Sequence, residues 1–111
     1  MSSCISVTTT TATKEEAQKI ARHLVAQRVA ACVQIAGPII STYRWQGKVE
    51  TAEEWLCVIK TRESLYPELE KAIISLHSYE TPEIIAVPII KGSREYLSWL
   101  KRETAILNLT D

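Results

Sequence analysis

The order of strand-like and helix-like segments in this sequence predicts an α+β protein with a ferredoxin-like fold. Four extended patterns and two helical patterns occur in the order β-α-β-β-α-β, and a C-terminal helical pattern follows them. A tight-turn sequence joins the second and third extended patterns, which predicts a long β-hairpin there. This order is typical of an antiparallel sheet with two helices on one face. The length of 111 residues is that of one domain, so we treat residues 1–111 as a single unit.

The first quarter of the chain predicts a strand followed by a helix. The residues from Cys4 to Thr11 are mostly β-branched, as is typical of a strand. The sequence Thr13-Lys14-Glu15-Glu16 then fits a capping box, with Thr13 as the N-cap and Glu16 reaching back to it. His23 falls on the polar face of the helix, where we expect it to be exposed. Apolar residues at helical spacing predict the buried face: Ala17, Ile20, Ala21, Leu24 and Val25.

The middle of the chain predicts the hairpin, over residues 39–61. Gly37-Pro38 interrupts the extended pattern just before it and indicates a bulge or bend. Gly47 can take the positive φ that a tight turn needs, which predicts the hairpin tip. Residues 55–60 are largely apolar on both alternating faces, and so are residues 84–90. Because an antiparallel sheet normally has one solvated face, we expect another subunit to cover the face that the helices leave open.

The second half of the chain predicts two more helices around the last strand. Ser64 can cap the first of them, with Pro67 in its first turn and an end near Ser78. After the strand, Gly92-Ser93 precedes a short helix, and residues 104–111 are predicted as a loose tail or short edge segment. The apolar positions of the earlier helix are Leu65, Leu69, Ala72, Ile73 and Leu76.

Composition argues against several classes of function. Thirteen Lys and Arg balance thirteen Asp and Glu, whereas a nucleic-acid-binding protein needs clustered cations that face phosphates. No apolar run approaches the roughly 20 residues that cross a bilayer, so we expect no membrane partner. Cys4, Cys32 and Cys57 form no C-x-x-C pair, and free buried thiols are typical of a reducing compartment. We therefore expect a cytoplasmic protein.

Chemically capable side chains gather between the second helix and the last strand, in the segment Leu76-His77-Ser78-Tyr79-Glu80-Thr81-Pro82-Glu83. We call this segment the corner. Its imidazole, phenol and carboxylates are groups that serve general acid–base catalysis or bind metals. The alternative is structural: His77 would cap the C-terminus of its helix, and Glu83 would pair with Lys60 across the sheet. The residues alone leave both interpretations open.

Read together, five segments resemble the CutA family of divalent-cation tolerance proteins. They lie in the family's order and extend the likeness from residue 4 to about residue 103. The resemblance implies a ferredoxin-like protomer in a homotrimer similar to the PII signalling proteins, with the long hairpin reaching a neighbour. The segments are residues 28–35 (RVAACVQI), 41–48 (STYRWQGK), 59–61 (IKT), 77–84 (HSYETPEI) and 92–99 (GSREYLSW).

The resemblance also implies two kinds of site. Some bacterial members of the family hold copper with a cysteine of the first strand and adjacent histidines at the corner. Those positions are Thr9, Leu76 and His77 here, so only His77 keeps a metal-binding side chain. PII-like trimers bind small ligands between subunits, which implies a cleft for a small anionic ligand. We expect its lining to include Tyr43, Trp45, Lys60, His77, Tyr79 and Glu83.

These observations together predict a non-enzymatic homotrimer of the CutA type that takes part in the response to divalent metal ions. We expect it to sense a small ligand or a metal such as copper. Its partners would be copies of itself, with a divalent metal or a small anion as ligand. Two alternatives stay open. The first is a small enzyme that uses His77 for acid–base chemistry, and the second is a structural trimer that binds a partner protein.

Overall fold

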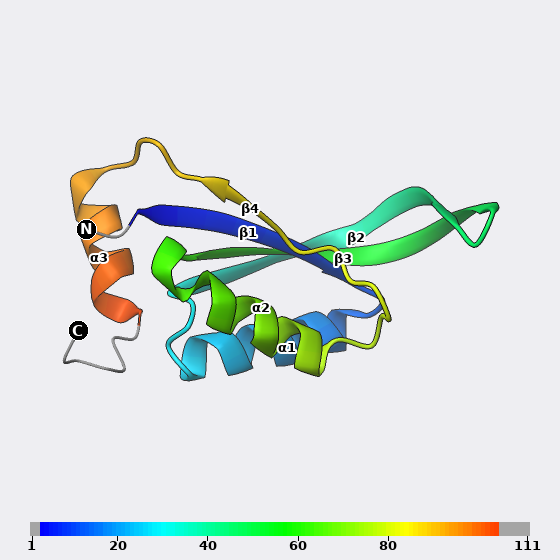
Figure 1. Ribbon diagram of the computed structural model, residues 1–111, viewed down its shortest axis with the longest axis horizontal. Helices are drawn as coiled ribbons and strands as arrows, with labels where there is room; N and C mark the ends of the chain where they lie inside the picture. The colour runs from blue at the N-terminus through cyan, green and yellow to red at the C-terminus, as the bar shows by residue number, and fades with distance from the viewer. Residues whose placement is uncertain (1–2, 105–111) are drawn as a thin grey trace.

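The computed structural model describes residues 3–104, and its elements follow the predicted order (Figure 1). A single turn of 3-10 helix, η1 (Glu63–Leu65), precedes the second helix. The strands are β1 (Cys4–Thr11), β2 (Cys32–Trp45), β3 (Lys48–Arg62) and β4 (Ile85–Pro88), and the helices are α1 (Lys14–Ala26), α2 (Tyr66–Leu76) and α3 (Arg94–Glu103).

The four strands form one antiparallel sheet in the order β2-β3-β1-β4. Helices α1 and α2 lie together on one face of this sheet, as Figure 1 shows. Helix α3 lies at the end of the sheet where β1 begins (Figure 1), and its Leu100 packs against Cys4. The ferredoxin-like α+β fold predicted from the sequence is therefore confirmed.

The hydrophobic core fills the space between the sheet and the two helices. Its residues on β1 and β3 alternate along each strand, because successive side chains point to opposite faces of a sheet. Those on α1 recur at helical spacing, as the sequence pattern predicted, but Val25 of the predicted buried face is 42% exposed at the edge of the stripe. His23 lies on the other face of α1 and is exposed, as expected. The fully buried core residues are Val7, Ala17, Ile20, Leu24, Cys57, Ile59, Leu69 and Ile73.

The hairpin of β2 and β3 is longer than predicted. Its paired residues run from Cys32 with Lys60 to Trp45 with Lys48, whereas the sequence predicted pairing only over residues 39–61. The expected bulge is present, as a register shift between Ala36 and Ile39, but pairing continues on both sides of it. Gln46 and Gly47 form the tip with positive φ values. The far half of the hairpin extends past the helices as a two-stranded arm (Figure 1).

Two capping predictions need correction. Thr13 accepts a hydrogen bond from the Glu16 N–H at 3.1 Å, as predicted, but the Glu16 carboxylate binds the N–H and hydroxyl of Ser78 instead of reaching back to Thr13. Helix α2 begins after Leu65 without a side-chain cap, and Ser64 lies within η1. In both places a tertiary contact or an extra turn replaces a local capping pattern.

The end of the chain differs from the sequence prediction in extent. Strand β4 has four residues, so the extended pattern of residues 84–90 is only partly a strand. Helix α2 ends at Leu76, two residues before the predicted end. Of the predicted tail over residues 104–111, all but Thr104 lies outside the described residues.

The sheet face opposite α1 and α2 is partly open. On β4, Ile85 and Val87 are 53% and 52% exposed, and their partners on β1 are Thr8 and Ser6. Directly paired residues point to the same face, so these four side chains lie together on the open face. Coverage of this face by another subunit stays a prediction. None of the helices described in residues 3–104 is long and apolar enough to cross a membrane.

Candidate functional site

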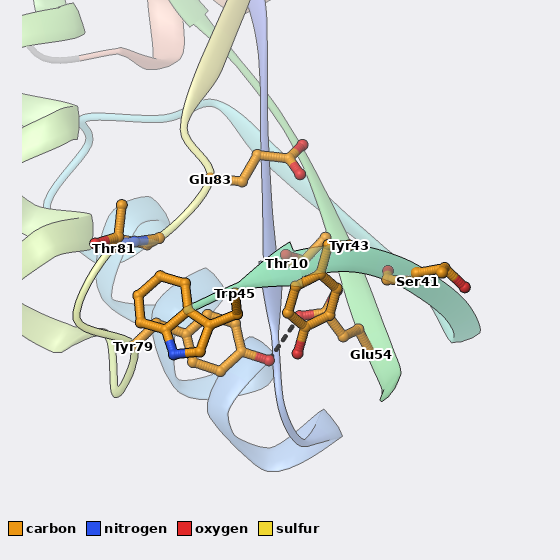
Figure 2. Close-up of a pocket in the computed structure, with 10 residues that line it drawn as sticks. Thr10, Ser41, Tyr43, Trp45, Glu54, Tyr79, Thr81 and Glu83 are labelled. Atoms are coloured by element: carbon orange, nitrogen blue, oxygen red, sulfur yellow. Dashed lines mark hydrogen bonds between the residues drawn. The ribbon is translucent and has the colours of Figure 1, made fainter. Parts of the chain in front are cut away.

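A cavity of about 720 Å³ lies where the corner meets the hairpin and the end of β1 (Figure 2). The hairpin contributes side chains from both of its strands, and β1 contributes Thr10 from its C-terminal end. The residues that line the cavity are Thr10, Ser41, Thr42, Tyr43, Trp45, Glu54, Tyr79, Thr81, Pro82 and Glu83.

The bulge at Gly37-Pro38 aims the hairpin's aromatic side chains into this cavity. Before the bulge, Ala36 pairs with Leu56, and after it Ile39 pairs with Glu54, so β2 contains one extra residue. One extra residue reverses which face of the sheet each later side chain of the strand points to. Tyr43 and Trp45 therefore lie on the same face as Glu54, away from α1 and α2. Without the bulge they would point to the helical face.

Tyr79 and Glu54 form the short hydrogen bond at the centre of the site (Figure 2). The phenol donates to Glu54 Oε2 at 2.6 Å, and Glu54 is only 6% exposed. Burial raises the pKa of Tyr79 far above its ordinary value, and the hydrogen bond to Glu54 and its charge raise it further. Tyr79 is therefore a permanent neutral donor that fixes the position of the Glu54 carboxylate.

His77 lies behind Tyr79 rather than in the cavity. Its side chain is fully buried, and its ring contacts that of Tyr79 at a centroid distance of 4.9 Å. Nδ1 accepts the backbone N–H of Tyr79 at 3.1 Å, and Nε2 lies 2.8 Å from the carbonyl oxygen of Thr10. Because an N–H can only donate and a carbonyl can only accept, the proton sits on Nε2. His77 thus ties the corner to the end of β1.

This geometry corrects both interpretations of the corner's histidine. His77 occupies the C-cap position of α2, but the bonds described for its ring go to Thr10 and Tyr79 rather than to the carbonyl groups that end the helix. Its imidazole is also not open to a substrate, because the side chain is buried. The histidine acts on the site through Tyr79, which it holds in place.

Lys60 does not join the cavity. Its Nζ donates to Gln34 Oε1 at 2.7 Å, on the open face of the sheet. The carboxylate of Glu83 instead accepts from the Thr8 hydroxyl at 3.4 Å. The predicted pairing of Lys60 with Glu83 is therefore wrong, because each has a nearer partner on a neighbouring strand.

The positions that correspond to the family's copper ligands do not offer a copper site within one protomer. Thr9 is fully buried, and its hydroxyl has no hydrogen-bond partner among the described residues, while Leu76 packs against the hydrophobic core. Both ring nitrogens of His77 already have partners. Across residues 3–104, no three His, Cys, Asp or Glu side chains gather in a way that would hold a metal ion. The donor set that residues 3–104 offer within one chain therefore does not fit copper.

The cavity thus unites four predicted residues with others that the sequence reasoning missed. Tyr43, Trp45, Tyr79 and Glu83 line it, whereas Lys60 and His77 do not. Glu54 is the main omission, since it is a buried carboxylate at the centre of the site. The available signal was its place on the same strand face as Leu56 and Val58, where a charged residue is unusual.

Comparison with known proteins connects the chain to one family. Residues 5–103 match the family model described as "CutA1 divalent ion tolerance protein". The divalent-cation tolerance protein CutA of Thermus thermophilus is 45% identical over 95 residues, which cover 86% of this chain and 92% of that protein. The chloroplastic protein CutA of Arabidopsis thaliana is 44% identical over 100 residues, which are 90% of this chain and 55% of that protein. The chain thus spans about half the length of the plant relative.

Solved structures agree with the sequence comparison. The divalent cation tolerance protein of Thermus thermophilus superposes with a TM-score of 0.90 at 43% identity, over 92% of this chain and 99% of that one. CutA1 of Oryza sativa gives a TM-score of 0.91 at 42% identity, over 94% and 95% of the two chains. The likeness therefore covers the fold as well as the sequence.

Proposed function

This chain belongs to the CutA1 divalent ion tolerance family, and on that basis we propose that it acts as a homotrimer in the response to divalent metal ions. The family match over residues 5–103 is the observation that carries the proposal. We further propose that the protein is a sensor rather than an enzyme. The burial of His77 supports this, because the corner's imidazole cannot reach a substrate.

Two features of the protomer support self-association. Ile85 and Val87 leave an apolar surface on the open face of the sheet, and such exposed apolar patches are typical of interfaces. Strand β2 forms one edge of the sheet, so one side of its backbone has no strand partner among residues 3–104. A trimer would cover both, in the arrangement that the resemblance to PII-like proteins implies.

The cavity beside Tyr79 is the proposed sensing site. Its volume of about 720 Å³ falls in the range of small-molecule sites, and its lining combines aromatic walls with a few fixed polar groups. We propose that a small ligand bound here is what the trimer reports on. The free cysteines, of which Cys4 and Cys57 are buried, support a reducing compartment such as the cytoplasm.

Copper binding at His77 stays a prediction. A copper ion would have to displace the Tyr79 N–H from Nδ1 or the Thr10 carbonyl from Nε2. A calorimetric titration with Cu(II) of the native protein and of a His77→Ala variant measures this directly. Equal Cu(II) affinity of the two proteins would remove His77 from any metal site.

Deleting the gene in its host and measuring growth at raised Cu(II) and Zn(II) tests the proposed function. We expect the deletion to lower the metal concentration that the cells tolerate, and the native gene to restore it. The same cells grown with raised NaCl serve as a control for general stress. Unchanged growth at every Cu(II) and Zn(II) concentration would contradict the proposal.

A further inference from the structure

The cavity has an acidic and aromatic lining. Tyr43, Trp45 and Tyr79 supply three aromatic rings, and Glu54 and Glu83 supply two carboxylates. Among the described residues that line it there is no Lys, Arg or His. The positive charge that Lys60 was expected to supply is bonded to Gln34, outside the cavity.

We propose that this cavity binds a small organic cation, a substituted ammonium. The inference deepens the small-ligand sensing proposed above and rests on it. The ligand charge is opposite to that expected from the sequence, where Lys60 suggested an anionic ligand. An anion would instead meet two carboxylates, and the described lining residues include no Lys, Arg or His to offset them.

The aromatic side chains form one wall of the site. Within a single chain, Tyr43 and Trp45 are 43% and 42% exposed, so part of each side chain can contact a ligand in the cavity. Figure 2 shows them gathered with Tyr79 at the end of the cavity where Glu54 lies. The face of an aromatic ring carries negative potential and attracts a cation within about 6 Å of its centre. Such a wall suits ammonium groups that carry methyl substituents.

Glu54 supplies a negative charge beside this wall. Its carboxylate is buried and receives a hydrogen bond from Tyr79, which is a neutral donor. No Lys, Arg or His of residues 3–104 lies within ion-pair distance of it. A buried carboxylate without an ion-pair partner is costly, and a bound cation would offset that cost. Glu83 adds a second, exposed carboxylate on the other side of the cavity.

A substituted ammonium fits this lining better than a metal ion. Ca²⁺ and Mg²⁺ require about six oxygen ligands, and transition metals require imidazole or thiolate ligands at close range. The lining offers two carboxylates, hydroxyl groups and ring faces, and ring faces give no lone pairs. Methyl groups on the nitrogen can pack against the rings while the charge faces Glu54.

Choline and 3,3-dimethylbutan-1-ol provide a direct test, since the second replaces the charged nitrogen of the first by carbon at nearly the same shape. Their affinities for the full-length protein are measured by calorimetry and by tryptophan fluorescence. We expect choline to bind roughly tenfold more tightly than the alcohol, as a cation–π site with a carboxylate requires. Equal affinities of the two compounds would overturn the proposal, as would the absence of choline binding.

The Glu54→Gln variant tests the charge while keeping an acceptor for Tyr79. We expect it to lower choline affinity about fivefold or more and to leave the affinity for the alcohol unchanged. Glu53→Gln is the matched control, because Glu53 is exposed and adjacent but points to the other face of β3. Equal choline affinity in the Glu54→Gln and Glu53→Gln variants would also overturn the proposal.

Failure of this inference can be told apart from failure of the proposed function. If the protein bound inorganic phosphate or ATP more tightly than choline while metal tolerance still depended on the gene, the proposed sensing role would stand. Only the proposal of a cationic ligand would then be refuted. Choline binding in cells whose metal tolerance does not depend on the gene would refute the metal response and leave the cation site standing.

Discussion

At the scale of single residues, the site depends on buried polar groups whose partners lie far away in sequence. His77 bonds the carbonyl of Thr10, 67 residues earlier, and Tyr79 bonds Glu54, 25 residues earlier. The composition of the corner indicated the importance of His77 and Tyr79. It gave no sign of their partners, because a side chain's type does not specify what folds against it.

The unpaired hydroxyl of Thr9 gives the first prediction. Thr9 is fully buried on β1, and its hydroxyl has no hydrogen-bond partner within the described structure. A Thr9→Val substitution keeps the shape and removes the unsatisfied group, so we expect it to raise the free energy of unfolding by about 1 kcal/mol. Thermal unfolding followed by calorimetry measures the change.

Thr61→Val is the matched control for that substitution. Thr61 is equally buried, but its hydroxyl donates to the carbonyl of Val29 at 2.7 Å. We expect its loss to lower the free energy of unfolding by about 1–2 kcal/mol, since the carbonyl is left unpaired. If Thr9→Val destabilised the protein as much as Thr61→Val, Thr9 would have a polar partner in solution.

The thiol of Cys57 gives a pH-dependent prediction. Burial raises its pKa from 9.0 to about 11, helped by the charge of Glu16. The folded state therefore holds the thiol proton more tightly than the unfolded state, so this stability is complete below pH 9 and is lost as the pH rises to about 11. We expect the native protein to lose roughly 2–3 kcal/mol across this window from Cys57 alone.

A Cys57→Ala variant isolates this effect. The cavity it creates lowers stability by a constant amount, so only the slope of stability against pH is compared. We expect the slope between pH 9 and 11 to be shallower in the variant, as measured by urea unfolding. Parallel slopes in the two proteins would show that the Cys57 thiol is not responsible.

At the scale of elements, the bulge in β2 decides which side chains reach the site. The sequence Gly37-Pro38 predicted an irregularity, and the register shift confirms it. What followed from it was not predicted: one extra residue turns Tyr43 and Trp45 to the face of Glu54. A strand pattern shows that side chains alternate between the two faces of the sheet. Which face each side chain takes after a bulge depends on how the strand pairs with its neighbour.

The two hairpin glycines are expected to differ in cost when replaced by alanine. A Cβ at Gly37 would lie 2.6 Å from the Trp55 ring, whereas a Cβ at Gly47 meets nothing within 4 Å. We expect Gly37→Ala to lower the free energy of unfolding by about 2–3 kcal/mol through overpacking at the bulge. Gly47→Ala should cost about 1 kcal/mol, from its φ of +80° alone.

Calorimetric unfolding of both variants provides the comparison. Gly47→Ala serves as the control for adding a methyl group to the hairpin without a clash. A smaller loss of stability in Gly37→Ala than in Gly47→Ala would mean that Trp55 can move away from the bulge without cost.

At the scale of the whole molecule, residues 3–104 form an elongated chain in which one face of the sheet has no helix over it. Its extents are 48 × 27 × 23 Å, and the hairpin arm accounts for much of the length (Figure 1). The apolar character of residues 84–90 predicted that another subunit covers one face of the last strand, and within a single chain Ile85 and Val87 are exposed on that face. The proposed trimer would bury both.

Charge placed on the open face is expected to break the trimer. We expect native protein to scatter light as three times the protomer mass of 12.5 kDa. Ile85→Glu and Val87→Glu would each bury an unpaired carboxylate in the interface, so we expect both variants to dissociate at micromolar concentration. Light scattering after size exclusion measures the mass.

Ile74→Glu is the control for this prediction. Ile74 is 55% exposed, close to the 53% of Ile85, but it lies on α2, on the other side of the sheet. Its variant should keep the native mass. A native protein of monomer mass, or an Ile85→Glu variant that remains a trimer, would contradict the proposed arrangement.

The sequence by itself determined the fold class, the order of elements, the hairpin tip, the bulge and the family. The fold class, the element order, the hairpin tip and the bulge follow from local signals, since strand and helix periodicity and turn residues act over a few neighbouring positions. The family follows from the resemblance of five sequence segments. The tertiary structure alone decided that Lys60 binds Gln34, that His77 supports Tyr79, and that Glu54 completes an acidic aromatic cavity. Those contacts depend on strand register and on bonds between distant segments, which a linear pattern does not encode.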